Sequence, residues 1–296
     1  LVIFTHMKKL FLKTITTISL LAFNCVCSDA TMLVVDYQGE TVVHQQSIER
    51  NLLVNCNEAG RFNIAFKPLE DALRSLDGKV EIPLQNVYFN NTHEDIFMRY
   101  NDYSTVFENI LMEGAPRQLT AKVRDFGMIP AGVYNLNFEV QTTDLETGTI
   151  SSTSTFNLQF IVPVIQEIKV QGQTPQIRVS TENVIKGTKR MVNESSPMIY
   201  INSNSDWILN VKTDDFDNSK AKFYIRTIAA SSNVNERLQE KVLLEPYREI
   251  ILAKGKAPCN NQFVTVEFSV ENENGKVIKA GNYENKIRYV LSEDRS

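Results

Sequence analysis

The chain has 296 residues, of which 43% are hydrophobic, and a formal net charge of −4. This length is sufficient for about two domains, each with a core of its own. A mildly acidic chain without runs of Lys and Arg excludes a protein built to bind the phosphate backbone of nucleic acid.

The N-terminal segment is typical of a secretory signal. Three lysines form a basic start, residues 15–23 form an apolar core too short to span a membrane, and we expect cleavage near Ser28 or Ala30. Cys25 and Cys27 leave lipidation open as an alternative. Removal of the three lysines takes the formal charge from −4 to −7, and the mature protein is expected to be secreted.

Most of the remaining chain is predicted to form short β-strands, because apolar and polar residues alternate and turn residues lie between the segments. In one of them, Val264, Val266 and Phe268 are expected to face a core. The predicted strands cover residues 31–37, 50–56, 61–66, 79–89, 117–126, 132–140, 150–162, 198–202, 207–213, 221–228, 249–253 and 262–270, and a further strand is predicted from Tyr283 to Leu291.

Helical periodicity occurs in only two places. Pro68 at a first-turn position, leucines at helical spacing and a final Gly78 predict a short helix over residues 68–78. A weaker pattern predicts a second helix over residues 233–244. With so little helix, the chain is predicted to be all-β, with two tandem immunoglobulin-like β-sandwich domains.

The two halves of the chain resemble each other. We therefore predict an upstream and signal segment over 1–30, a first domain over 31–162 and a second over 163–296, with the boundary near Pro163. The aligned blocks are VNCNEAGRFNI (54–64) with INSNSDWILNV (201–211), ILMEGAP (110–116) with ILAKGKAP (251–258), and PAGVYNLNFEV (130–140) with KAGNYENKIRYV (279–290).

Each half contains the motif Ala-Gly-x-Tyr, with Gly132 and Tyr134 in the first and Gly281 and Tyr283 in the second. Glycine can adopt the positive φ of a tight turn, and tyrosine offers a large ring to the core while its hydroxyl reaches an edge carbonyl. We interpret these residues as a structural turn and strand, not as a binding site.

The second half is one strand shorter than the first. The strand over 132–140 is followed by the strand over 150–162, whereas only polar residues follow the strand that ends at Leu291. We therefore expect the second sandwich to lack its last strand, and to expose a hydrophobic groove and unpaired backbone amides and carbonyls.

The PAG-x-Y segment and the final strand resemble those of bacterial fimbrial subunits of the chaperone–usher type, and of spore-coat-U-like secreted domains. The resemblance implies a two-domain tip adhesin, with a complete adhesive domain followed by a pilin domain that accepts a strand from a neighbouring subunit. It also implies other fimbrial subunits, a periplasmic chaperone, an usher and a glycan or protein receptor as partners. The protein would pass through the periplasm to the cell surface or fimbrium.

Cys56 and Cys259 are the cysteines that remain after cleavage, one in each half of the chain. In an oxidising compartment they could form a disulfide between the halves, and the alternative is two separate buried thiols. Their separation leaves no pair for the disulfide that is usual within a pilin domain.

No motif indicates catalysis, a cofactor or a metal. THED (92–95) fits a polar loop better than an acid–base cluster, and TDDFDNS (213–219) lacks the Gly and the closing Glu of a calcium loop. Trp207, the only tryptophan, is expected in the core or at its rim, not on a sugar.

The sequence thus predicts a secreted, non-enzymatic surface protein that mediates adhesion and assembles by donor-strand complementation. One alternative is a self-contained glycan- or protein-binding module, whose groove would be filled internally by residues 31–43 or 168–173. A periplasmic assembly chaperone and a hydrolase are the other classes.

Overall fold

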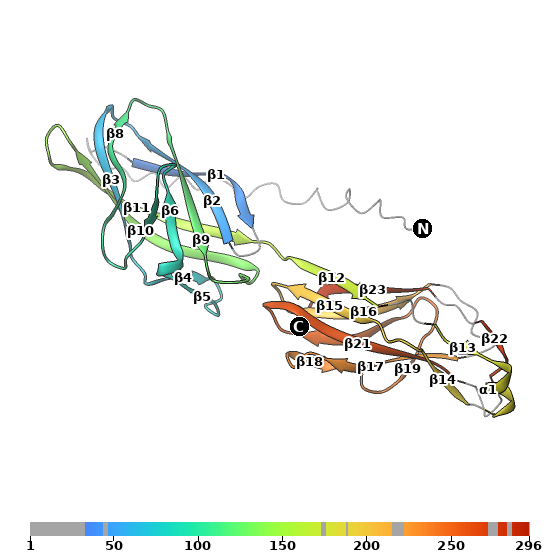
Figure 1. Cartoon of the computed structure of the whole chain (residues 1–296). Coiled ribbons are helices and arrows are strands. Elements are labelled where there is room, and N and C mark those ends of the chain that lie inside the picture. The colour runs from blue at the N-terminus through green and yellow to red at the C-terminus, as the bar shows by residue number, and fades with distance from the viewer. Residues whose placement is uncertain are drawn as a thin grey trace.

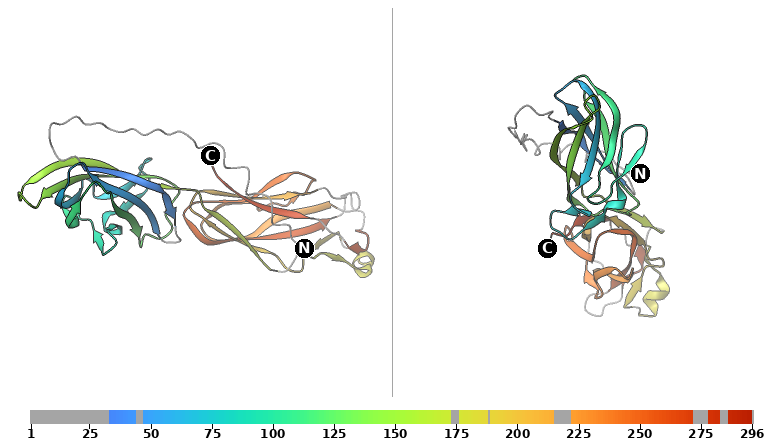
Figure 2. Two further views of the ribbon diagram at one scale, coloured as in Figure 1. Left: turned by 90° about the horizontal axis from the view of Figure 1, so that it is seen from above. Right: turned by 90° about the vertical axis from the view of Figure 1, so that its left-hand side faces the viewer.

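The computed structural model describes residues 33–43, 47–172, 176–187, 189–214, 222–271, 278–282 and 286–295, so the predicted signal lies outside the described residues. Antiparallel strands dominate, and the all-β prediction is confirmed. They form two lobes placed end to end and joined by the segment between β11 and β12 (Figures 1 and 2). No helix among the described residues is long and apolar enough to cross a membrane.

The first lobe contains two facing sheets. One has the order β1-β2-β9-β6-β7, and the other runs β8-β3-β10-β11, with β4 and β5 attached to β10. The elements are β1 (Leu33–Val43), β2 (Ser47–Cys56), β3 (Gly60–Pro68), β4 (Ala72–Ser75), β5 (Glu81–Pro83), the 3₁₀ turn η1 (Leu84–Asn86), β6 (Val87–Asn90), β7 (Asp95–Phe97), β8 (Ser104–Met112), β9 (Arg117–Arg124), β10 (Gly132–Asp144) and β11 (Ile150–Val162).

The second lobe also contains two facing sheets, with a related strand order and with β14 attached to β21. One sheet has the order β12-β15-β21-β17-β19, the other β18-β20-β16-β23, and β13 pairs separately with β22. The elements are β12 (Gln166–Gln171), β13 (Arg178–Val179), α1 (Thr181–Ile185), β14 (Arg190–Val192), β15 (Met198–Ser203), β16 (Trp207–Thr213), β17 (Lys222–Ala230), β18 (Val234–Arg237), β19 (Val242–Leu243), β20 (Glu249–Gly255), β21 (Cys259–Glu271), β22 (Gly281–Asn282) and β23 (Ile287–Glu293).

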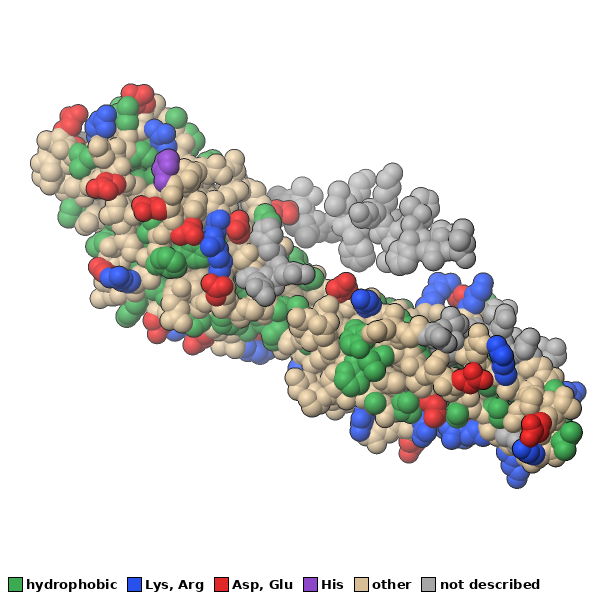
Figure 3. Space-filling view, viewed as in Figure 1, with side chains coloured by type: hydrophobic (Ala, Val, Ile, Leu, Met, Phe, Trp, Pro, Cys, Tyr) green, Lys and Arg blue, Asp and Glu red, His purple; other side chains and the backbone are tan. Residues whose placement is uncertain are grey.

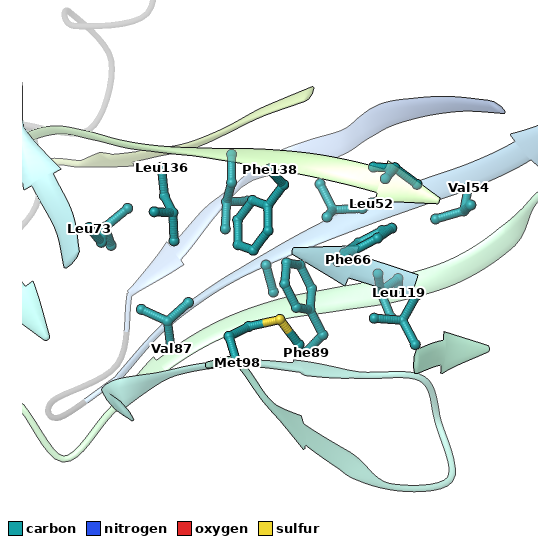
Figure 4. Packing of buried hydrophobic residues seen from close by; sticks show 14 of the residues in the cluster. Leu52, Val54, Phe66, Leu73, Val87, Phe89, Met98, Leu119, Leu136 and Phe138 are labelled. Carbon is teal, nitrogen blue, oxygen red and sulfur yellow. The ribbon is translucent and has the colours of Figure 1, made fainter. Parts of the chain in front are cut away.

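Each lobe has its own hydrophobic core. In the first, Phe66, Phe89 and Phe138 come from different strands and meet at ring-centroid distances of 5.2 to 6.1 Å (Figure 4). In the second, Val264 and Val266 are fully buried, as the alternation on β21 predicts. Both cores follow from strands that turn every second side chain inward.

The two predicted helices are wrong. Residues 68–78 form a turn and β4, because β4 pairs with β5 and β10 and only Leu73 enters the core, while Leu69 and Leu76 are exposed. Residues 233–244 contain β18 and β19 instead. In both places strand pairing overrides a local helical pattern.

A short helix that the periodicity did not predict, α1, begins after Ser180. The Ser180 hydroxyl accepts a hydrogen bond from the Asn183 amide, and the Asn183 side chain accepts one from the Ser180 amide. This capping box was the available sequence signal.

The lobes meet at Asn204, which is 2% exposed. Its side-chain amide donates hydrogen bonds to the carbonyls of Ile129 (3.3 Å) and Pro163 (2.9 Å), and its Oδ1 accepts one from the amide of Ile165 (2.7 Å). Its carbonyl accepts a further bond from the amide of Ala131, at 2.8 Å. One buried side chain of the second lobe thus holds both the linker and a loop of the first.

Candidate strand-acceptor edge

β23 is the last strand of its sheet. It pairs antiparallel with β16, from Thr213 opposite Ile287 to Trp207 opposite Glu293. Among the described residues no strand pairs with its other side. The backbone groups on that side therefore lack a ladder partner in this part of the chain.

The equivalent strand of the first lobe has neighbours on both sides. β10 occupies the position of β23. Across the sheet, β10 is followed by β3 and β8, just as β23 is followed by β16 and β20. β11 then covers the other side of β10 over its length, with Gly132 opposite Val162 and Thr143 opposite Ile150. The described part of the second lobe has no counterpart of β11.

The side chains on the two strands reflect this difference. On β10, Tyr134, Leu136 and Phe138 are 0% exposed, and on β11 Leu158 and Phe160 are equally buried. On β23, the residues that pack against the second core, Ile287 and Leu291, are only partly buried. The apolar surface left exposed there is what an additional strand would cover.

Tyr289 lies between these two residues on the same face of β23. Burial raises the pKa of its phenol, which keeps the ring neutral at physiological pH. Its hydroxyl is enclosed and has no hydrogen-bond partner among the described residues. The inward face of β23 is therefore apolar and uncharged from Ile287 to Leu291.

β12 forms the opposite rim. It is the edge strand of the facing sheet, it contacts β23, and its Ile168 is partly buried against the same core. We call the set formed by Ile168 on β12 and Ile287, Tyr289 and Leu291 on β23 the acceptor edge. Periodicity placed three of these residues on a strand, but the role of Ile168 depends on a pairing between strands far apart in sequence.

Neither segment that could have filled this position internally does so. The described residues of the segment 31–43 form β1, which pairs with β2 in the first lobe. Those of the segment 168–173 belong to β12, which pairs with β15 in the facing sheet. Neither pairs with β23.

The Ala-Gly-x-Tyr motif has a structural role in the first lobe. Gly132 has a φ of +153°, and the Tyr134 hydroxyl donates a hydrogen bond of 2.8 Å to the carbonyl of Pro130. Burial raises the pKa of Tyr134 to about 12. In the second lobe Gly281 lies on β22 and pairs with Val179, while Tyr283 lies outside the described residues.

Cys56 and Cys259 are two separate buried thiols, and no disulfide joins them. Cys56 is 2% exposed in the first core, and Cys259 is 5% exposed in the second. Burial raises the pKa of each thiol, which keeps both protonated and unreactive.

Two other sequence candidates, His93 and Trp207, lie in a turn and in the second core. His93 lies in a turn where Asn91 Oδ1 accepts hydrogen bonds from the amides of His93 (3.0 Å) and Glu94 (3.1 Å). Trp207 is fully buried in the second core. The candidate calcium residues 215, 217 and 219 lie outside the described residues.

Acidic and basic side chains are interspersed over both lobes on the face shown in Figure 3. One ion pair joins Arg288 of β23 to Asp214, which follows β16, at 2.9 Å. Neither sign of charge dominates that face, so the acceptor edge is distinguished by its apolar side chains and open backbone rather than by charge.

No protein-family model and no curated protein sequence matches this chain. Among solved structures, the adhesin CfaE of CFA/I from enterotoxigenic E. coli is 10% identical, with a TM-score of 0.29, and covers 89% of this chain and 82% of its own. The class 5 fimbriae chaperone CfaA is 14% identical, with a TM-score of 0.25, over 86% and 98%. A Salmonella alpha-2-macroglobulin is 12% identical, with a TM-score of 0.24, over 90% of this chain and 17% of its own. At TM-scores below 0.5, these similarities carry no argument about function.

Proposed function

We propose that this chain is a non-enzymatic subunit of a secreted surface fibre of the fimbrial type, and that its second lobe binds a strand donated by another subunit along β23. The observation that supports this most strongly is the strand order of the two lobes. The run β8-β3-β10 of the first lobe corresponds to β20-β16-β23 of the second, and β11, the strand that follows β10, has no counterpart among the described residues.

The donor is an extended segment with apolar residues at alternate positions. By analogy with β11 on β10, it runs antiparallel to β23. Backbone pairing supplies much of the affinity, and insertion of alternate side chains against Ile168 and Tyr289 supplies the specificity. Complete burial of each apolar side chain contributes about 1.5–3 kcal/mol.

The first lobe is the distal, adhesive module in this proposal, because its sheet already has its final strand. Its receptor is a glycan or a protein. A periplasmic chaperone and an usher deliver the subunit, which then resides at the cell surface, at or near the tip of the fibre.

The test measures hydrogen exchange of the full chain with and without extended peptides of alternating apolar pattern, including a peptide with the sequence of residues 150–162. We expect a bound peptide to slow exchange of the backbone amides in residues 287–293 and to raise the midpoint of thermal unfolding. Scrambled peptides of the same composition are the control. Unchanged exchange with every peptide would contradict strand acceptance along β23.

A matched pair of variants locates the binding face. Leu291→Asp places a charge on the inward side of β23, whereas Val290→Asp places it on the outward side, where Val290 is 38% exposed. We expect Leu291→Asp to weaken peptide binding by about a hundredfold or more, because a buried unpaired carboxylate is costly, and Val290→Asp to change it little. Equal effects of the two substitutions would mean that the peptide binds elsewhere.

A further inference from the structure

The outer edge of β11 is closed by side chains instead of a strand. β11 is also the last strand of its sheet, and it pairs by its backbone only with β10. An unprotected edge of this length would invite pairing with another chain. In this lobe, side chains from β1 and β2 occupy four outward backbone groups of β11 between Asn157 and Ile161.

Tyr37 from β1 occupies two of these groups. Its hydroxyl donates a hydrogen bond to the carbonyl of Asn157 and accepts one of 2.8 Å from the amide of Gln159. Burial raises the pKa of Tyr37, so the hydroxyl keeps its proton and both bonds at physiological pH. The phenol thus replaces a donor and an acceptor that an added strand would have supplied.

Thr41 and Arg50 occupy the next two groups. The Arg50 guanidinium donates to the carbonyl of Gln159, and the Thr41 hydroxyl accepts a hydrogen bond of 3.0 Å from the amide of Ile161. The guanidinium carbon also lies 3.8 Å from the centre of the Tyr37 ring, which holds the two side chains together. Four successive outward groups, from the Asn157 carbonyl to the Ile161 amide, therefore have side-chain partners.

We propose that Tyr37, Thr41 and Arg50 seal the β11 edge against strand addition by a second copy of this chain, so that β23 is left as the edge at which the protein adds a strand. The sealing of β11 stands on its own geometry. Only the statement that β23 is the edge at which a strand is added rests on the proposed function.

A purely structural role for these residues, holding β1 against β11, predicts a loss of stability and nothing else. Sealing predicts in addition that removal of the hydroxyls creates a self-association that the native protein lacks. The measurement is therefore the oligomeric state together with its location on the chain.

The test uses the full chain with Tyr37→Phe and Thr41→Val, which keep the ring and the branched shape but remove both hydroxyls. In sedimentation velocity, we expect the self-association constant to rise by about tenfold or more relative to the native chain. In dilute solution, where the variant is monomeric, exchange of the Gln159 and Ile161 amides should become faster. At higher concentration, residues 155–162 should become protected.

A control variant removes the same atoms elsewhere. Tyr100 is 60% exposed and Thr143 lies on the central strand β10, so Tyr100→Phe with Thr143→Val should leave the chain as monomeric as the native protein. Adding Ile161→Lys to the unsealed variant puts a charge on the β11 edge and should restore the monomer.

Two results would overturn sealing. One is an unsealed variant that exchanges faster at Gln159 and Ile161 yet stays monomeric at every concentration. The other is self-association that protects residues 287–293 in place of 155–162. If the double variant does not fold, Thr41→Val alone frees the Ile161 amide and supports the same comparison.

Discussion

At the scale of single residues, the second core depends on a glycine that lets an indole ring lie against the backbone. A Cβ atom at Gly255 would lie 2.3 to 2.8 Å from three atoms of the Trp207 ring, closer than real Cβ contacts allow. These two residues face each other across β16 and β20. The backbone of β20 is thus shaped around Trp207.

We expect Gly255→Ala to lower the free energy of unfolding of the second lobe by about 3 kcal/mol, because the ring is enclosed and must shift. Trp207 is the only tryptophan, so its fluorescence during urea unfolding reports this lobe. Gly60→Ala is the comparison, since its Cβ would approach the Phe62 ring no closer than 3.0 Å and should cost much less. Equal costs would show that the indole contact does not determine the packing.

At the scale of elements, ion pairs join the strands on the outer face of the sheet around β21. Glu267 on β21 is bound by Arg226 of β17 at 2.8 Å and by Arg190 of β14 at 2.6 Å. The hydrogen bond from Arg226, with the charges of both arginines, lowers the pKa of Glu267. Lys241 and Arg190 pair similarly with Glu271. These pairs hold the short strand β14 against the sheet.

The pKa of Glu267 is lower in the folded state than in the unfolded chain. At pH values above the unfolded-state pKa, the ionised carboxylate therefore stabilises the folded state. The contribution is lost as the pH falls through the folded pKa. We expect Glu267→Gln to reduce stability by about 1 kcal/mol at pH 7 and to have a smaller effect near pH 3. Denaturant unfolding at both pH values measures this. Glu182→Gln, in an exposed pair with Lys186, should have little effect at either pH. A loss of the same size at the lower pH would mean that charge is not the cause.

Strand positions were more predictable than helices or edges. The strands at 150–162 and 207–213 match the prediction residue for residue, because alternation and turn residues mark both ends. β8 was missed, since its alternation is broken by an irregularity near Asn109, whose φ is +48°. The bonds between Tyr37 and β11 join residues 120 positions apart, and no local pattern announces such a contact. The described part of the second lobe has no counterpart of β11, and the repeat pointed to this comparison because it makes one half of the chain a template for the other.

At the scale of the whole molecule, Asn204 is the point that couples the lobes. Its side chain makes three hydrogen bonds to the linker and to a loop of the first lobe. The Gly-Ser-type composition that gives a flexible linker is absent from Pro163 to Ile165. The two sandwiches are therefore expected to move as one rigid rod.

We expect Asn204→Ala to leave each lobe folded but to increase the rate of proteolysis at residues 163–165 by roughly tenfold, because the buried bonds to the linker are lost. Small-angle X-ray scattering should show a broader range of lobe orientations. Asn202→Ala removes a neighbouring asparagine whose bonds stay inside the second lobe and should change neither result. Superimposable scattering curves for native and Asn204→Ala protein would refute the coupling.

The direction of β23 has a consequence for how a fibre would be built. β23 runs from the end of the second lobe that is remote from the first lobe towards the end that faces it. At that end, the backbone amide of Asp294 donates a hydrogen bond to the carbonyl of Asp206, two residues after Asn204. A donated segment that pairs antiparallel with β23 therefore begins at the end that faces the first lobe and finishes at the remote end of the second lobe. If the donated segment precedes its own folded body in the sequence, that body lies beyond the remote end of the second lobe. The first lobe then lies at the opposite end of the molecule from that body.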